Sequence, residues 1–175
     1  MPYTRGSLRL LLARKPWLLP AVITMVKHPF AMTTSEIAER LGVKSTLIKR
    51  ALWWLSKIDA VACSESIPRR CRLREQARRE AIEILQSSFQ REGRLVLRQG
   101  REYLLIAIKP TRISVWTVPV EVVERVYEVL KAGGSCFKPG DVSNTLGIPP
   151  RLASLSLTVL YVVGRASRRD GCYQV

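Results

Sequence analysis

The chain of 175 residues is poor in several residue types that carry chemistry. Histidine occurs once, as His28, and asparagine once, as Asn144. The sequence contains no Gly-rich phosphate loop, metal-ligand cluster or nucleophile motif. We therefore expect neither catalysis nor a bound metal or cofactor. His28 is interpreted as the end of a helix, where a cation is favourable.

Long apolar runs are also missing, since no stretch reaches the ~18 apolar residues that a membrane span needs. The segment 17–26 is apolar and follows Arg14 and Lys15, as in a signal peptide. Lys27 and His28 follow it, however, and no small-residue cleavage site is evident. We interpret the segment as a buried helix and expect an intracellular protein without membrane contact.

Acidic residues number 14 against 29 lysines and arginines, which gives a formal net charge of +15. Solubility requires a magnitude of only about 2 to 8 in a small domain. The excess predicts a polyanionic partner, with nucleic acid as the first candidate and an anionic membrane surface as the second. Charge alone does not distinguish DNA from RNA.

One segment of the chain recurs in outline. Residues 35–43 and 140–148 share a pattern that ends in Leu41-Gly42-Val43 and in Leu146-Gly147-Ile148. The two segments are 105 residues apart, and the same offset relates Leu47 to Leu152, Leu52 to Leu157 and Leu55 to Leu160. A short helix, a tight turn and a second helix with an apolar stripe predict a helix-turn-helix, and the repeat predicts two of them.

The first half is expected to contain several helices and a hairpin. Helices are predicted over about 16–27, from Thr33, which has the capping-box spacing to Glu36, and over about 45–58. Residues 61–63 and 71–73 are interpreted as the two strands of a wing around a turn at 66–69. A further amphipathic helix is predicted over about 74–89. Residues 1–15 are basic and form either an extra helix or a loose arm.

In the second half of the chain the spacing of apolar residues changes from one typical of helices to one typical of strands. The runs 94–98, 102–108 and 113–117 favour strands and predict a three-stranded meander. Pro119 is expected to open a helix over 120–132, which Gly133 and Gly134 end. Helices over 139–146 and 150–163 and a hairpin that turns at 168–171 complete the chain.

Both halves resemble winged helix-turn-helix domains. The first resembles transcriptional regulators in which a turn like Leu41-Gly42-Val43 precedes a helix that begins with Ser or Thr. The resemblance covers 16–90 and 119–175. It leaves the N-terminal arm and the meander unexplained, and it implies an α+β fold, mainly helical with small β-hairpins. Together with the patterns described above, it leads us to expect four parts: a basic N-terminal arm (1–15), a first module with its C-terminal helix (16–90), a β-meander linker (91–118) and a second module (119–175).

Within that fold the four cysteines suit two bridges. Cys63 and Cys71 flank the turn of the first wing, and Cys172 lies in a strand that a winged helix brings toward Cys136. Scarce asparagine and abundant arginine are typical of thermophiles, and hyperthermophile intracellular proteins do carry disulfides. The cysteine spacing matches no zinc site. Two bridges and four buried free thiols remain equally compatible with the sequence.

The helix over 45–58 is the candidate groove reader. If Ile48, Ala51, Leu52 and Leu55 face the core, the 3.6-residue period turns the other side to solvent. We predict that this side contacts DNA bases and phosphates, with Ser45 placing the first amides of the helix near a phosphate; its residues are Thr46, Lys49, Arg50, Trp53 and Lys57. The alternative is a solvated basic face. For the outward Trp53, packing is favoured over contact with DNA sugar or a dimer interface.

Arginine is densest between residues 69 and 79, where Glu75 is the only acid. We predict phosphate or minor-groove contact there, through Arg69, Arg70, Arg72, Arg74 and Arg78. The alternative is an ion-paired helix surface, since Arg79 lies four residues from both Glu75 and Glu83.

The second module has fewer cations on the equivalent helix face. The offset maps the five outward positions onto Arg151, Ser154, Leu155, Thr158 and Val162. Such a face suits contact with the meander or with a second subunit better than a groove. We expect a homodimer or a protein partner there. Secondary phosphate contacts are predicted for Arg151, Arg165, Arg168 and Arg169.

The leading hypothesis is sequence-preferring binding of double-stranded DNA, in transcriptional regulation, by a cytoplasmic, nucleoid-associated protein. The first module reads the groove, and the second provides dimerisation or a partner surface. The alternative is a winged-helix adaptor in a larger nucleic-acid machine, associated with RNA polymerase, replication or the ribosome, because this fold serves many roles.

Overall fold

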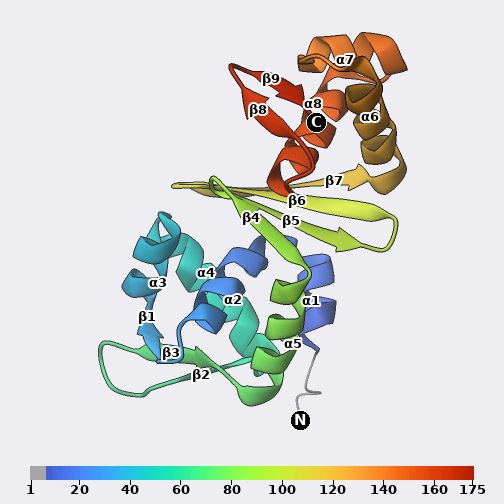
Figure 1. Ribbon diagram of the computed structural model, residues 1–175. Coiled ribbons are helices and arrows are strands. Elements are labelled where there is room, and N and C mark those ends of the chain that lie inside the picture. Colours follow the sequence, from blue (N-terminus) through green and yellow to red (C-terminus); the bar gives the residue numbers. More distant parts are fainter. Residues whose placement is uncertain (1–6) are drawn as a thin grey trace. The chain divides into compact units, whose positions relative to one another are not determined.

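The computed structural model describes residues 7–175, and the chain divides into two compact units (Figure 1). The first comprises the described residues up to Ser87 together with Ile106–Val115, and the second comprises Ser88–Leu105 and Trp116–Val175. Both units combine short helices with small sheets, so the protein is α+β. The segment 91–118, expected as a linker, supplies strands to both units. The first six residues of the expected arm, including Arg5, lie outside the described residues.

The first unit combines short helices with a three-stranded sheet. Its helices are α1 (Leu8–Arg14), the 3-10 helix η1 (Pro16–Leu18), α2 (Leu19–Lys27), α3 (Thr34–Leu41), α4 (Ser45–Lys57) and α5 (Glu75–Gln86). Its sheet has the order β1 (Met32–Thr33), β3 (Arg70–Leu73) and β2 (Val61–Cys63). The helices and the hairpin expected from the sequence are therefore confirmed, and α1 makes the extra helix the correct alternative for residues 8–14. The sequence did not predict β1.

Local signals at both ends of α3 place α4. The backbone N–H of Glu36 donates to the Thr33 hydroxyl (3.1 Å), and the Thr33 N–H donates to the Glu36 carboxylate (2.8 Å), which completes the predicted capping box. Gly42 ends α3 with φ +68°, a left-handed conformation that glycine adopts at little cost. Only Gly42, Val43 and Lys44 separate α3 from α4, so the two helices pack closely.

The helix expected over 74–89 is shorter than predicted. It ends at Gln86, and Ser88–Arg91 forms strand β4. Glu92 and Gly93 both have positive φ, as in the tight turns that favour two-residue hairpins, and β4 pairs with β5 from Ser88↔Leu97 to Arg91↔Arg94. The expected three-stranded meander is therefore a four-stranded sheet, because pairing with β5 outweighs continuation of the helical pattern.

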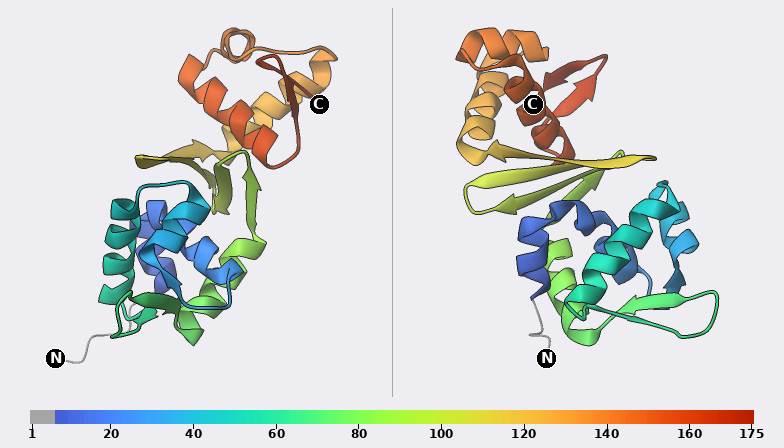
Figure 2. Two further views of the ribbon diagram at one scale, coloured as in Figure 1. Left: turned by 90° about the vertical axis from the view of Figure 1, so that its left-hand side faces the viewer. Right: turned by 180° about the vertical axis from the view of Figure 1, so that it is seen from behind.

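The second unit combines three helices and a hairpin with this sheet, and α8 is the helix that lies against β4 and β5 (Figures 1 and 2). The sheet has the order β4, β5 (Arg94–Gln99), β6 (Glu102–Lys109) and β7 (Arg112–Pro119). The middle part of the β6–β7 hairpin belongs to the first unit. The remaining elements were predicted and are confirmed: α6 (Val120–Gly133), α7 (Pro139–Leu146), α8 (Pro150–Val162), β8 (Ser167–Arg169) and β9 (Cys172–Gln174).

The two units bury the same positions of the repeat. Ile37 and its counterpart Val142 are fully buried, as are Leu55 and Leu160. In the second unit Leu160 belongs to a core shared by α6, α7, α8 and the sheet. The sequence repeat is therefore a repeat of core positions.

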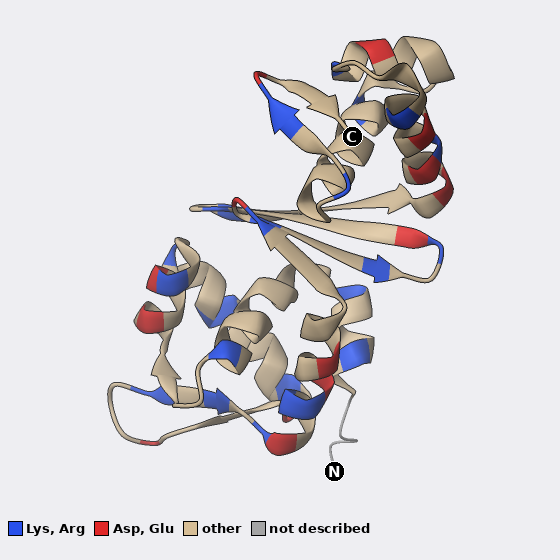
Figure 3. Cartoon of the chain, in the orientation of Figure 1, with Lys and Arg blue, Asp and Glu red and all other residues tan. Residues whose placement is uncertain are grey.

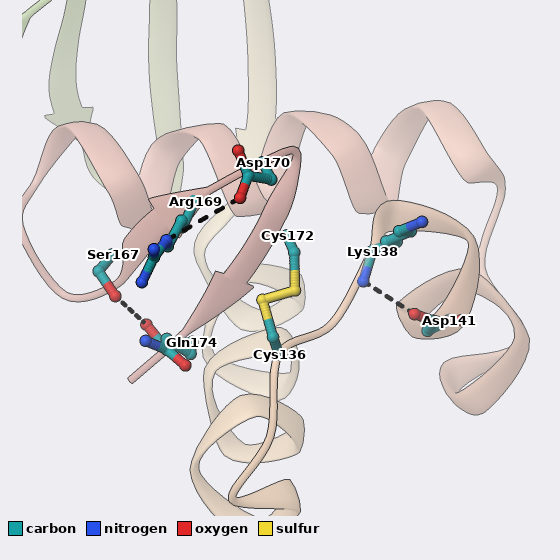
Figure 4. The surroundings of a disulfide bond; sticks show 8 residues. All are labelled: Cys136, Lys138, Asp141, Ser167, Arg169, Asp170, Cys172 and Gln174. Carbon is teal, nitrogen blue, oxygen red and sulfur yellow. Dashed lines mark hydrogen bonds and ion pairs between the residues drawn. A yellow bond between two sulfur atoms is a disulfide. The ribbon is translucent and has the colours of Figure 1, made fainter.

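Both pairs of cysteines form disulfides, which decides between the two alternatives. Cys63 and Cys71 are register partners on β2 and β3, with Cα atoms 4.1 Å apart. Cys136 and Cys172 have Cα atoms 5.5 Å apart (Figure 4). Phe137 and Tyr173, the next residues along, exchange two backbone hydrogen bonds of 2.8 Å, which hold Cys136 beside β9.

Candidate nucleic-acid interface

The outward side of α4 is a basic surface. Thr46, Lys49, Arg50, Trp53 and Lys57 are all exposed, while Ile48, Ala51, Leu52 and Leu55 are buried. The predicted division of the helix into two faces is therefore confirmed. No acidic residue lies on α4, so nothing on the helix itself neutralises Lys49, Arg50 and Lys57. Ser45, at the start of the helix, is half-buried.

A turn remote in the sequence adds cations near the start of α4. The Lys44 backbone N–H donates to the Pro110 carbonyl (2.8 Å), which joins the β6–β7 turn to the first residue before the helix. Lys109 and Arg112 flank that turn and are exposed, as is Lys44. Sequence reasoning missed these three cations because 65 residues separate Lys44 from Lys109, and no local pattern predicts such a contact.

The arginine-rich segment divides into structural and free cations. Arg70 pairs with Glu36 (3.2 Å), and Arg74 pairs with Asp59 (2.9 Å). Arg78 donates to the Val26 carbonyl at the end of α2 (3.0 Å). The remaining predicted contacts, Arg69 and Arg72, are exposed, and their side chains have no ion pair or hydrogen bond to any described residue.

Glu36 explains why Arg70 is held. The backbone N–H of Thr33 holds the pKa of the Glu36 carboxyl below its ordinary value, against partial burial, and Arg70 adds to this effect. The Arg70 guanidinium also donates to the Ala31 carbonyl (3.2 Å). Arg70 therefore links β3 to the start of α3. The cations of this hairpin that remain available to a ligand are its neighbours Arg69 and Arg72.

The expected ion pair between Glu75 and Arg79 is present at 3.1 Å. Glu83 instead pairs with Arg9 of α1. The surface of α5 therefore resembles the ion-paired helix surface that was the alternative more than the predicted phosphate-binding surface.

The corresponding face of α8 is covered by its own unit. Strands β4 and β5 lie against α8, Val162 is buried and Leu155 packs against the core of the unit. Of the two arrangements expected for this face, contact with the meander is the one in the structure. Leu155 and Val162 therefore offer little apolar surface to a partner, and of the five mapped positions Arg151 and Ser154, near the start of α8, are the exposed ones.

The cations of the second hairpin are mostly engaged. Arg165 forms two hydrogen bonds to Glu124 (2.5 and 3.0 Å) and lies 4.0 Å from the centre of the Tyr127 ring. Arg168 lies over the Tyr173 ring at 5.6 Å. Arg169 is exposed, 3.9 Å from the Asp170 carboxylate (Figure 4). Of the four secondary phosphate contacts predicted, Arg151, Arg168 and Arg169 are exposed and Arg165 is half-buried.

Charge is concentrated in the first unit. The stretches of sequence 1–87 and 106–115, which make up the first unit, include 18 Lys and Arg against 7 Asp and Glu, a net charge of +11. The second unit carries 11 against 7, or +4. Figure 3 shows the basic residues of the first unit on several helices and on the hairpin. Among the described residues no cluster of His, Cys, Asp and Glu could hold a metal ion, and no helix is long and apolar enough to cross a bilayer.

Comparison with known proteins finds no family model, curated protein or solved structure that matches this chain.

Proposed function

We propose that both units are winged helix-turn-helix modules and that the first binds double-stranded DNA through α4. The order of three helices and a hairpin, the capped α3 and the left-handed Gly42 are typical of this fold. The observation that carries the proposal is the outward side of α4, which is exposed, basic and free of acids over the whole helix.

In this proposal different cations have different tasks. Lys49, exposed on α4, donates to base edges or phosphates in the major groove. Arg69 and Arg72 on the β2–β3 hairpin, and Lys44, Lys109 and Arg112 around the start of α4, contact the phosphate backbone. Arg70, Arg74 and Arg78 keep their internal partners and support the surface instead of touching DNA.

The test compares one exposed cation on the outward side of α4 with one on the corresponding side of α8. Lys49→Ala is expected to weaken binding to a selected duplex site by about 5- to 150-fold, the loss of one base contact of roughly 1–3 kcal/mol. Arg151→Ala, on the corresponding face of α8, is the matched control and is expected to change affinity little. Fluorescence anisotropy with a labelled duplex, after selection of sites from random sequences, measures both. Equal losses in the two variants would contradict the proposed division between the units.

A second candidate function is that of an adaptor in a larger nucleic-acid machine. It is favoured by the covered face of α8, which leaves the second unit without an exposed reading helix. The first unit would then be a lone reader of an asymmetric site, and the second would dock on a protein. Isolation from cells separates the candidates: a regulator copurifies with duplex DNA, and an adaptor with ribosomes or a protein complex.

A further inference from the structure

Three of the four tryptophans of the chain gather on one side of the first unit. Trp53 and Trp54 come from α4, and Trp17 from η1. The rings of Trp53 and Trp54 meet edge to face, with centroids 4.8 Å apart. The Arg50 guanidinium lies 5.4 Å from the centre of the Trp17 ring, which ties η1 to α4.

A cationic side chain lies over each of these indole rings. Besides Arg50 on Trp17, the Lys57 ammonium lies 4.8 Å from the centre of Trp53, and the Lys15 ammonium lies 3.9 Å from the centre of Trp54. The ring holds the cation through its quadrupole and leaves the charge unneutralised. We name these six residues the indole surface: Lys15, Trp17, Arg50, Trp53, Trp54 and Lys57.

Packing does not account for Trp53. The core face of α4 is filled by Ile48, Ala51, Leu52 and Leu55, and Trp53 points away from it with 52 % of its surface exposed. Trp17 and Trp54 are half-buried and support it. An exposed indole beside cations on an acid-free helix indicates an anionic ligand with a flat apolar face.

Nucleic acid has such faces only where bases are unpaired. In a paired duplex the faces of each base are covered by its neighbours, so an indole in a groove meets base edges and sugar. An unpaired base exposes a face that stacks on an aromatic ring, while its phosphates lie within reach of cations beside the ring. We propose that the indole surface binds an unpaired base of DNA, which stacks on Trp53 while Arg50 and Lys57 contact the adjoining phosphates.

This inference rests on the proposed function, because it assumes that α4 binds DNA. It adds a preferred substrate: duplex DNA that contains, or ends in, unpaired bases. Trp53 then discriminates between paired and unpaired DNA, while Lys49 and the hairpin arginines bind both.

The test uses a labelled duplex and the same duplex with a central bubble of unpaired thymidines. The protein is expected to bind the bubble at least about five-fold more tightly, as one stacked base supplies. Trp53→Ala should abolish this preference for the bubble over the duplex, and Trp53→Phe should keep most of it. Phe30→Ala removes another exposed aromatic of the first unit, 80 % exposed, and is the matched control. Alanine suits an exposed helix position, so the Trp53→Ala variant should fold.

The outcomes separate the two proposals. Equal binding of bubble and duplex by the unaltered protein would overturn the inference and leave the proposed function standing. A bubble preference that survives Trp53→Ala would also overturn it. Failure to bind either DNA would overturn both.

Discussion

Arg165 is held from two sides in the second unit. Glu124 of α6 accepts two hydrogen bonds from its guanidinium, and the Tyr127 ring lies beneath it. The hydrogen bond raises the pKa of Arg165 and lowers the pKa of Glu124, in both cases against partial burial. This pair joins α6 to the segment between α8 and β8, so Arg165 has a structural role where the sequence predicted phosphate contact.

Glu124→Gln should make stability less dependent on pH. A carboxyl whose pKa is lowered by folding stabilises the protein above its ordinary pKa of 4.5, and the contribution is lost as the pH falls through the lowered value. Because the pair is partly exposed to solvent, we expect the variant to lose only roughly 0.5–1 kcal/mol of unfolding free energy at neutral pH. The loss should shrink below about pH 4.

Urea unfolding at neutral and acidic pH measures this difference. Glu128→Gln, at an exposed position of the same helix, is the control and should change little. A difference between Glu124→Gln and the unaltered protein that stays constant down to acidic pH would show that the ion pair contributes nothing.

At the scale of elements, α4 and α8 have the same length and the same buried positions, but different elements pack against them. Both are 13-residue helices that follow a glycine turn and bury corresponding leucines. In the first unit the outward side of α4 stays exposed, whereas β4 and β5 lie against α8. Arg91 at the end of β4 also stacks on Tyr161 and donates to its carbonyl (3.1 Å), which fixes the hairpin to the end of α8.

Leu155→Ala should therefore lower stability without changing the assembly state. Leu155 packs partly buried against the core of the second unit. Its truncation should lower the unfolding free energy by roughly 1–3 kcal/mol, less than for a fully buried leucine. Ser154→Ala, at an exposed neighbouring position of α8, should stay within about 0.5 kcal/mol. Light scattering should give the same molar mass for both variants and the unaltered protein. A lower molar mass for Leu155→Ala alone would restore the interface that the sequence suggested.

At the scale of the whole molecule, charge is unevenly distributed. The first unit carries a net charge of +11 and the second +4. The unit with the exposed α4 is thus also the one to which a polyanion is attracted most strongly.

Binding to duplex DNA should therefore depend steeply on salt. Free cations around α4 and on the β2–β3 hairpin, such as Lys44, Lys49, Arg69 and Arg72, release counterions when they contact phosphates. Four or more such contacts give a slope of about −4 or steeper in a plot of log affinity against log salt concentration. Anisotropy titrations in dilute and physiological buffer measure the slope, and the double variant Arg69→Ala, Arg72→Ala should reduce its magnitude by about 2. An affinity independent of salt would exclude phosphate binding.

Local signals in the sequence determined most elements and the direction of α4. The Thr33 capping box, the glycine turns and the spacing of buried leucines act over a few residues, so they can be read without the fold. They predicted the helices, both hairpins and the exposed side of α4. The same approach overextended the helix after Arg74, because strand pairing between β4 and β5 depends on residues that the helical pattern does not include.

Tertiary structure alone decided which charges are free and which apolar surfaces are covered. Arg70 and Arg72 are alike in the sequence, yet the Arg70 side chain pairs with Glu36, and the Arg72 side chain has no ion pair or hydrogen bond to any described residue. Lys109 comes near α4, and strands cover Val162, only through contacts between distant segments. Such contacts depend on which elements pack together. The basic character of the protein was therefore determined by its sequence, and the surface that presents this charge was determined by its fold.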